Sequence, residues 1–144
     1  YCILGDGEIQ EGQIWEAAQV ASHYGVSNLT AIIDNNRIQL DGFTDRIGGI
    51  SKITEKFRAF GWNSIEIDGH DVEKIDVALS EAATQKLAPT AIIANTVKGY
   101  GVSFMENNPK WHGNVPTEEE FKLAFEEIQS TIDHLELLRI GATQ

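Results

Sequence analysis

Two short polar motifs in the sequence could together hold a metal ion. Residues 5–7 read Gly-Asp-Gly and follow the apolar run of residues 1–4, while Asn36 follows the apolar run of residues 29–33. If both runs are neighbouring parallel strands, Asp6 and Asn36 lie at the edge where open α/β sheets bind ligands. Carboxylate and amide oxygens suit a hard divalent cation that also binds a diphosphate. The pattern fits equally well a helix cap at Asp6 and a simple turn at Asn36.

Strands and helices alternate in the predicted order, which defines the fold class. Continuous apolar runs predict buried strands, and apolar residues at helical spacing predict helices. Alternation of this kind implies an α/β fold with a parallel sheet and helices on both faces. The predicted strands span 1–4, 29–33, 62–67 and 90–94, the predicted helices span 13–24, 50–60, 72–83 and 118–138, and residues 37–49 and 98–113 are expected to be loops.

Several local features follow from the same patterns. Asp71 is expected to cap the helix that follows it, and Thr117 with Glu120 forms a capping-box pattern before the last helix. Cys2 is expected to be a small buried hydrophobic residue. The buried side of the 72–83 helix is predicted to consist of Val72, Ile75, Leu79, Ala82 and Ala83.

Composition and charge limit the kinds of partner and the location that the sequence predicts. The net charge of −11 argues against nucleic acid or an anionic membrane as a main partner. One cysteine excludes an intrachain disulfide framework, and no apolar run approaches the ~20 residues of a membrane span, so a cytoplasmic protein is expected. The chain begins on Tyr1 within an apparent core strand, which suggests a piece of a longer protein, incomplete at its N-terminus. Residues 133–144 are expected to fray or to lead into a linker.

Other phosphate and metal motifs are missing from the sequence. It contains no Gly-x-x-x-x-Gly-Lys-Ser/Thr and no Gly-x-Gly-x-x-Gly after a strand, which argues against a P-loop and a dinucleotide-binding Rossmann site. No cysteine and histidine cluster has the spacing of a zinc site.

Five ordered blocks resemble the transketolase family of thiamine diphosphate enzymes. A lone Gly-Asp-Gly is a weak signal, but five blocks in the order and spacing of the family are a strong one. They cover the chain to about Ile128. They are residues 5–17 (GDGEIQEGQIWEA), 34–42 (DNNRIQLDG), 67–71 (IDGHD), 98–101 (KGYG) and 111–113 (WHG).

The resemblance implies a role for each matching residue. Mg²⁺, or Ca²⁺ or Mn²⁺ in its place, would be held by Asp6, the Asn36 side chain and the Ile38 carbonyl. The thiamine diphosphate site would include Gly7, Leu40, Lys98 and His112: the Gly7 N–H would meet the diphosphate and Leu40 would pack on the thiazolium ring. Lys98 and His112 would lie on a loop over the diphosphate, and His112 would also reach the substrate as the catalytic residue. Glu11 and Glu16 match acids near the subunit interface.

The same resemblance implies an activity and partners. The chain would be part of the diphosphate-binding domain of an enzyme that transfers a two-carbon ketol unit between sugar phosphates. A pyrimidine-binding domain or subunit would complete the active site, in a homodimer or heterotetramer. The alternatives are 1-deoxyxylulose-5-phosphate synthase, a 2-oxo-acid dehydrogenase component, or a non-catalytic module of the same fold.

The remaining histidines and two of the tryptophans are not expected to take part in the chemistry. His70 is expected to be structural, His23 and His134 to be solvated, and Trp15 and Trp111 to serve packing or an interface.

Overall fold

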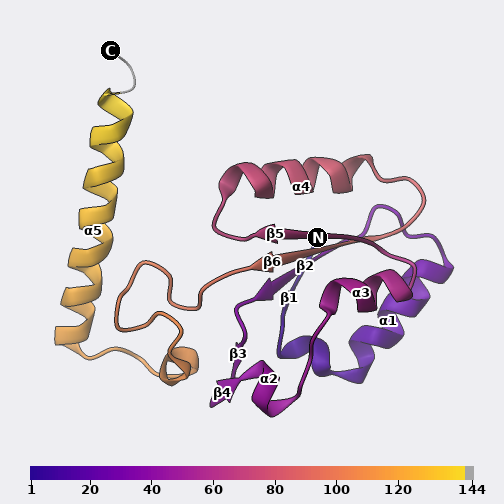
Figure 1. Cartoon of the computed structure of the whole chain (residues 1–144), viewed down its shortest axis with the longest axis horizontal. Helices are drawn as coiled ribbons and strands as arrows, with labels where there is room; N and C mark the ends of the chain where they lie inside the picture. Colours follow the sequence, from indigo (N-terminus) through magenta and orange to yellow (C-terminus); the bar gives the residue numbers. More distant parts are fainter. Residues whose placement is uncertain (142–144) are drawn as a thin grey trace.

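Four parallel strands form the central sheet of the protein. The computed structural model describes residues 1–141, and the sheet order is β1-β2-β6-β5 (Figure 1). Leu4 of β1 pairs with Ile33 of β2, and Ile33 in turn pairs with Ile93 of β6. The predicted α/β fold with a parallel sheet is therefore confirmed. The strands are β1 (Cys2–Gly5), β2 (Thr30–Asn35), β5 (Asn63–Asp68) and β6 (Thr90–Asn95).

Helices cover both faces of this sheet. Helices α1 (Gly12–His23) and α3 (Ile53–Ala59) lie on one face, and α4 (Val72–Thr84) lies on the other (Figure 1). The larger core forms beneath α1 and α3, around Ile33, Ile93 and the fully buried ring of Phe57. The smaller core lies beneath α4, where Ala78 and Ala82 pack near Ile92. Small side chains on α4 let the helix lie close to the sheet.

The segment predicted as a loop, residues 37–49, contains short regular elements instead. Strands β3 (Ile38–Gln39) and β4 (Gly42–Phe43) pair in a two-residue hairpin, and a one-turn helix α2 (Thr44–Ile47) follows. No hydrophobic period could reveal elements of two to four residues. The other predicted loop, 98–113, ends in the short 3₁₀ helix η2 (Pro109–His112), and another, η1 (Glu8–Gln10), precedes α1.

Three expectations about burial were wrong. Cys2 is exposed and its neighbour Ile3 is 73% exposed, because β1 is at the edge of the described sheet and only Leu4 packs into the core. Val72 and Ala83 are also exposed. Val72 is the first residue of α4, beyond the part of the helix that faces the sheet, which is centred on Ala78 and Ala82.

The capping predictions were correct. The Asp71 carboxylate accepts hydrogen bonds from the N–H groups of Glu73 and Lys74, both at 3.1 Å. At the last helix, the Thr117 hydroxyl accepts from the Glu120 N–H at 3.2 Å, and the Glu120 carboxylate accepts from the Thr117 N–H at 2.8 Å. These reciprocal bonds satisfy backbone donors that the first turn of a helix leaves unpaired.

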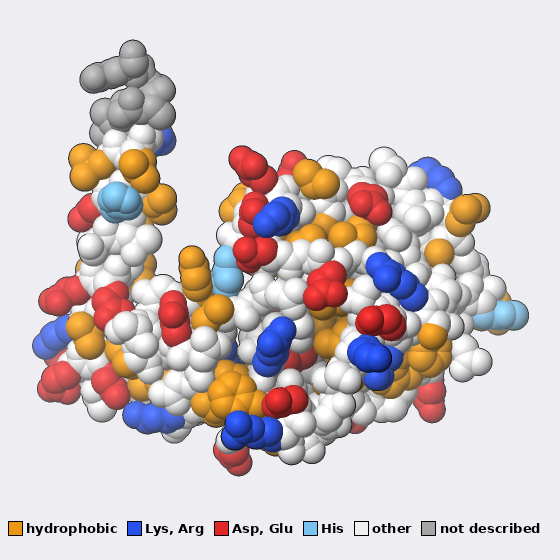
Figure 2. Space-filling model, in the orientation of Figure 1, with side chains coloured by type: hydrophobic (Ala, Val, Ile, Leu, Met, Phe, Trp, Pro, Cys, Tyr) orange, Lys and Arg blue, Asp and Glu red, His pale blue; other side chains and the backbone are white. Residues whose placement is uncertain are grey.

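The last helix, α5 (Glu118–Gly141), projects away from the sheet (Figure 1). It carries exposed apolar side chains such as Phe125 and Leu135, and Figure 2 shows hydrophobic groups along the projecting part. Most of the segment expected to fray, residues 133–144, is helical as far as Gly141, and residues 142–144 lie outside the described part. Within the described residues no helix is both long and apolar enough to cross a membrane.

Candidate functional site

Asp6 lies at the carboxyl end of β1 with only 1% of its surface exposed. Its Oδ2 atom accepts a 2.7 Å hydrogen bond from the Arg37 N–H and a 3.4 Å bond from the Thr44 hydroxyl. Both of these bonds fall on Oδ2 and do not use Oδ1, which can therefore face a cation. The two donors come from the segment after β2, so Asp6 joins two neighbouring strand ends. The helix-cap alternative is wrong, because Gly7 and Glu11, not Asp6, are the N-cap residues of η1 and α1.

The electrostatic environment of Asp6 favours a neutral carboxyl or a bound cation. Burial raises the pKa of Asp6 above its usual value, and the charge of Asp34 adds to this effect. The Arg37 and Gly7 N–H groups and the Thr44 hydroxyl oppose it by stabilising the carboxylate, but only in part. No salt bridge among residues 1–141 reaches Asp6. A buried carboxylate in this state gains from a cation that replaces its lost hydration.

Asn36 lies in the turn between β2 and β3, and its neighbour Arg37 contacts Asp6. Its Oδ1 accepts the Ile38 N–H at 3.0 Å, which closes a local turn, and its Nδ2 donates to Asp34 Oδ2 at 3.0 Å. The expected turn at Asn36 is therefore present, and it also fixes the direction of the amide oxygen. Arg37, between the two predicted ligands, has a φ of 63°, a left-handed conformation that non-glycine residues rarely adopt. Its N–H reaches Asp6 in this conformation.

Gly7 packs against the end of β3, and Leu40 lies in the loop of the β3–β4 hairpin that follows it. A Cβ on Gly7 would lie 2.7 Å from both the Cβ and the Oε1 of Gln39, so only glycine fits against β3. Leu40 is in the hairpin loop with a φ of 43° and is 64% exposed. An apolar side chain held out in this way can cover one face of a bound ring.

The loop that carries Lys98 and His112 folds tightly on itself. The Lys98 carbonyl accepts from the Asn107 N–H at 3.0 Å, and Gly99 has a φ of 74°. A Cβ on Gly99 would come within 2.7 Å of the backbone of Met105. Lys98 is half-buried, whereas His112, the last residue of η2, is exposed. Helix η2, which ends at His112, contacts β3 of the hairpin that follows Asn36.

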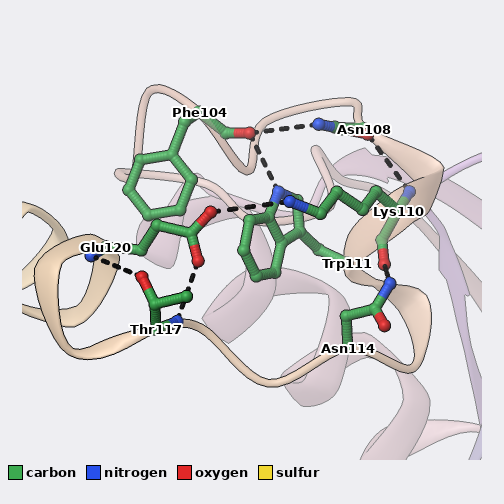
Figure 3. A network of polar contacts seen from close by, with 7 residues as sticks. All are labelled: Phe104, Asn108, Lys110, Trp111, Asn114, Thr117 and Glu120. Carbon is green, nitrogen blue, oxygen red and sulfur yellow. Dashed lines mark hydrogen bonds and ion pairs between the residues drawn. The ribbon is translucent and has the colours of Figure 1, made fainter.

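A network of polar contacts anchors η2 to the start of α5 (Figure 3). The Trp111 indole N–H donates to the Phe104 carbonyl at 3.0 Å, and the Lys110 ammonium lies 4.5 Å from the Trp111 ring centroid. Lys110 also forms a 3.5 Å salt bridge with Glu120, the residue that takes part in the α5 cap. These contacts hold the residues just before His112 against the start of α5 and give Trp111 the packing role predicted for it.

A cleft of about 940 Å³ opens beside this site, at the carboxyl ends of β2, β5 and β6. Its lining includes Asn36, Arg37 and His70. The Nε2 atom of His70 accepts the Val97 N–H at 2.8 Å, and its ring stacks on Tyr100 with centroids 3.9 Å apart. These contacts give His70 the structural role that was expected.

The family-model comparison decides the identity of the domain. Residues 1–131 match the model described as "Transketolase, thiamine diphosphate binding domain". The chain belongs to the transketolase family. It is 39% identical over 136 residues to an apulose-4-phosphate transketolase subunit of Phocaeicola vulgatus, and the match covers 94% of this chain and 48% of that protein. It is 40% identical over 132 residues to human transketolase, covering 92% of this chain and 21% of that protein.

A transketolase crystal structure from Campylobacter jejuni has the same fold as this chain. The TM-score is 0.82 at 35% identity, and the match covers 88% of this chain and 20% of the other. The chain thus spans about half the length of the Phocaeicola vulgatus relative and about a fifth of the longer transketolases.

The donor set fits the metal and diphosphate that the transketolase family implies. The buried Asp6 carboxylate has no cation of its own in residues 1–141, the Asn36 oxygen is held in a fixed direction, and the backbone at Gly7 is free of a side chain. The described residues contain no group of three or more His, Cys, Asp or Glu placed to hold a metal ion. One carboxylate, one amide and one carbonyl need no such group, because Mg²⁺ takes its remaining ligands from phosphate and water.

Sequence reasoning missed two residues that act on the predicted ligands. Thr44 is buried and donates to Asp6, yet it lies in a segment without any periodic pattern. The Arg37 N–H makes the shorter of the two bonds to Asp6, and a backbone donor leaves no trace in residue type. Glu11 and Glu16 are exposed on and before α1, and their place at a subunit interface stays a prediction.

Proposed function

We propose that this chain supplies the metal- and diphosphate-binding half of a transketolase active site. The complete enzyme would transfer a two-carbon ketol unit from a ketose phosphate to an aldose phosphate, with Mg²⁺ and thiamine diphosphate. The observation that supports this most strongly is the buried Asp6 carboxylate beside the Asn36 turn, without a salt bridge in the described residues. A module that had lost its cofactor would gain nothing from keeping this charge buried.

Each residue of the site has a distinct task in this proposal. Asp6, the Asn36 side chain and the Ile38 carbonyl would hold Mg²⁺, with Ca²⁺ or Mn²⁺ as substitutes, and the Gly7 N–H and Lys98 would bind the diphosphate. Leu40 would pack on the thiazolium ring and exclude water from it. When bound, thiamine diphosphate supplies the nucleophilic carbon and accepts the electrons of the cleaved bond.

His112 would be the catalytic residue of this half-site. Histidine can donate or accept a proton near pH 7, which suits it to bind a sugar oxygen and to move a proton to or from it. His112 is exposed at the end of η2, and η2 contacts β3, the strand after Asn36, which supports a place for His112 near the predicted metal site. The contacts of Trp111 and Lys110 hold this segment against α5.

A partner polypeptide would complete the active site. Two relatives that this chain matches over 48% and 47% of their length are named as transketolase subunits, which supports a divided enzyme. A pyrimidine-binding domain or subunit would cover the cofactor, giving a homodimer or a heterotetramer in the cytoplasm. The exposed apolar side chains of α5 and of Ile3 on β1 provide surface that such a partner could bury.

The test is a transfer assay on the completed protein, meaning this chain with the polypeptide that supplies the pyrimidine-binding domain. Transfer from xylulose 5-phosphate to ribose 5-phosphate is expected, and the Asp6→Ala variant should have lost it. Reaction of pyruvate with glyceraldehyde 3-phosphate, without ketol transfer, would replace the proposal with 1-deoxyxylulose-5-phosphate synthase. No reaction of either kind, with no cofactor bound, would favour a non-catalytic module.

A further inference from the structure

Asp34, the last but one residue of β2, contacts both predicted metal-binding segments without being a predicted ligand. Its side-chain Oδ2 accepts from Asn36 Nδ2 at 3.0 Å, and its backbone carbonyl accepts from the Asp6 N–H at 3.2 Å. Its Oδ1 accepts the hydroxyl of Thr96, the first residue after β6. We propose that Thr96 and Asp34 are positioning residues that orient the Asn36 amide for the cation. This proposal rests on the proposed metal site.

The orientation of the Asn36 amide depends on which of its neighbours can donate. An ionised carboxylate only accepts hydrogen bonds, whereas an amide both donates and accepts. Asn36 must therefore turn its Nδ2 toward Asp34, and its Oδ1 then faces the other way, where it accepts the Ile38 N–H at 3.0 Å. One lone pair of Oδ1 remains for a cation. If the amide turned over, its NH₂ group would face the cation and could not bind it.

Thr96 holds Asp34 because the sheet register places them together. Asp34 pairs with Ala94 in the β2–β6 ladder, and the Thr96 N–H donates to the Asn35 carbonyl at 3.3 Å. The Thr96 side chain is packed as well: a Cβ on Gly69 would lie 2.5 Å from its Cγ2. Gly69 therefore leaves the room that the Thr96 methyl group occupies, and the hydroxyl is directed at Asp34.

The experiment measures Mn²⁺ binding to the completed protein with thiamine diphosphate, by electron paramagnetic resonance. Asp34→Asn keeps the shape of the side chain but can donate to Asn36 Oδ1, so the amide of Asn36 is free to turn over. We expect the Mn²⁺ Kd to rise about 10–100-fold, as for other partners of metal ligands. Thr96→Val should also raise the Mn²⁺ Kd, whereas Thr96→Ser, which keeps the hydroxyl, should have the wild-type affinity. Asp68→Asn is the matched control, since Asp68 ends β5 and accepts from the His70 N–H.

The outcomes separate this inference from the proposed function. Wild-type Mn²⁺ affinity in Asp34→Asn and Thr96→Val, with binding lost in Asp6→Ala, would overturn the positioning role and leave the metal site intact. A lowered unfolding temperature of the metal-free variants with unchanged Mn²⁺ affinity would overturn it too, because it would reduce Asp34 to a structural residue. If Asp34→Asn does not fold, Thr96→Val with its Thr96→Ser control decides. No Mn²⁺ binding by the wild type would overturn the proposed function and the inference together.

Discussion

Removal of the Asp6 charge should change how the stability of the metal-free protein depends on pH. The variant Asp6→Asn is neutral at every pH and keeps one oxygen that can accept the 2.7 Å bond from the Arg37 N–H. The wild-type carboxyl has a pKa raised above its usual value of 3.8, chiefly by burial. The two proteins therefore differ by a single buried titration.

The direction in which stability changes with pH follows from the linkage between protonation and folding. A group whose pKa is raised on folding stabilises the folded state fully below its unfolded pKa, here 3.8, and this contribution is lost as the pH rises through the folded pKa. Each unit by which folding raises the pKa of Asp6 removes about 1.4 kcal/mol of stability at neutral pH. The free energy of unfolding of the wild type, minus that of Asp6→Asn, should accordingly fall above pH 3.8 and become constant above the folded pKa.

Bound metal and cofactor should reverse the order of stability of the two proteins at neutral pH, so that the wild type becomes the more stable one. A ligand present at 100 times its Kd stabilises the protein that binds it by about 2.7 kcal/mol. Wild type should gain this at neutral pH with Mg²⁺ and thiamine diphosphate, and Asp6→Asn should gain much less. Urea unfolding of both proteins between pH 4 and 8, in chelator and in ligand, measures both effects. A difference that is flat or rises with pH in chelator would refute the explanation by burial.

Three further predictions concern the elements around Asp6. Gly7→Ala should lower the free energy of unfolding by about 1–3 kcal/mol in urea titrations, because its Cβ would meet Gln39 at 2.7 Å. Gly12→Ala, whose Cβ would meet nothing within 4 Å, is the control, and an equal effect of both variants would contradict the close packing of Gly7 on Gln39. In steady-state kinetics and calorimetry, His112→Gln should lower kcat for ketol transfer by about 10²–10⁴-fold and affect cofactor affinity far less. A large loss of cofactor affinity with little change in kcat would make His112 a diphosphate ligand only. Thr117→Ala should destabilise the α5 N-terminus by about 0.5–2 kcal/mol and speed amide exchange there, whereas Thr117→Ser should not; equal exchange in both would remove the capping role.

The neighbouring positions of the two strand ends that carry Asp6 and Asn36 could be predicted because they depend on long regular elements. Two apolar runs joined by a helix make neighbouring parallel strands the natural arrangement, and residues at their carboxyl ends then meet. The structure places them so, with the Asp6 N–H bound to the Asp34 carbonyl. What the pattern could not show was which hydrogen bonds the two side chains would make.

The contacts that complete the site could not be predicted, because they depend on irregular backbone. Arg37 and Leu40 adopt positive φ values that their residue types do not suggest, and the β3–β4 hairpin depends on them. Thr44 reaches Asp6 only through that hairpin. Likewise, the exposure of Cys2 depends on the place of β1 at the edge of the described sheet, which an apolar run does not reveal.

The most direct test of the proposed metal–diphosphate site is calorimetry of Mg²⁺ and thiamine diphosphate on the completed protein. If Asp6 and the Asn36–Ile38 turn hold a cation that bridges to the diphosphate, each ligand should strengthen the binding of the other. Asp6→Ala should then lose both ligands together, and Glu8→Ala, an exposed acid two residues away, should bind them as the wild type does. Unchanged affinity for both ligands in Asp6→Ala would contradict the proposed site.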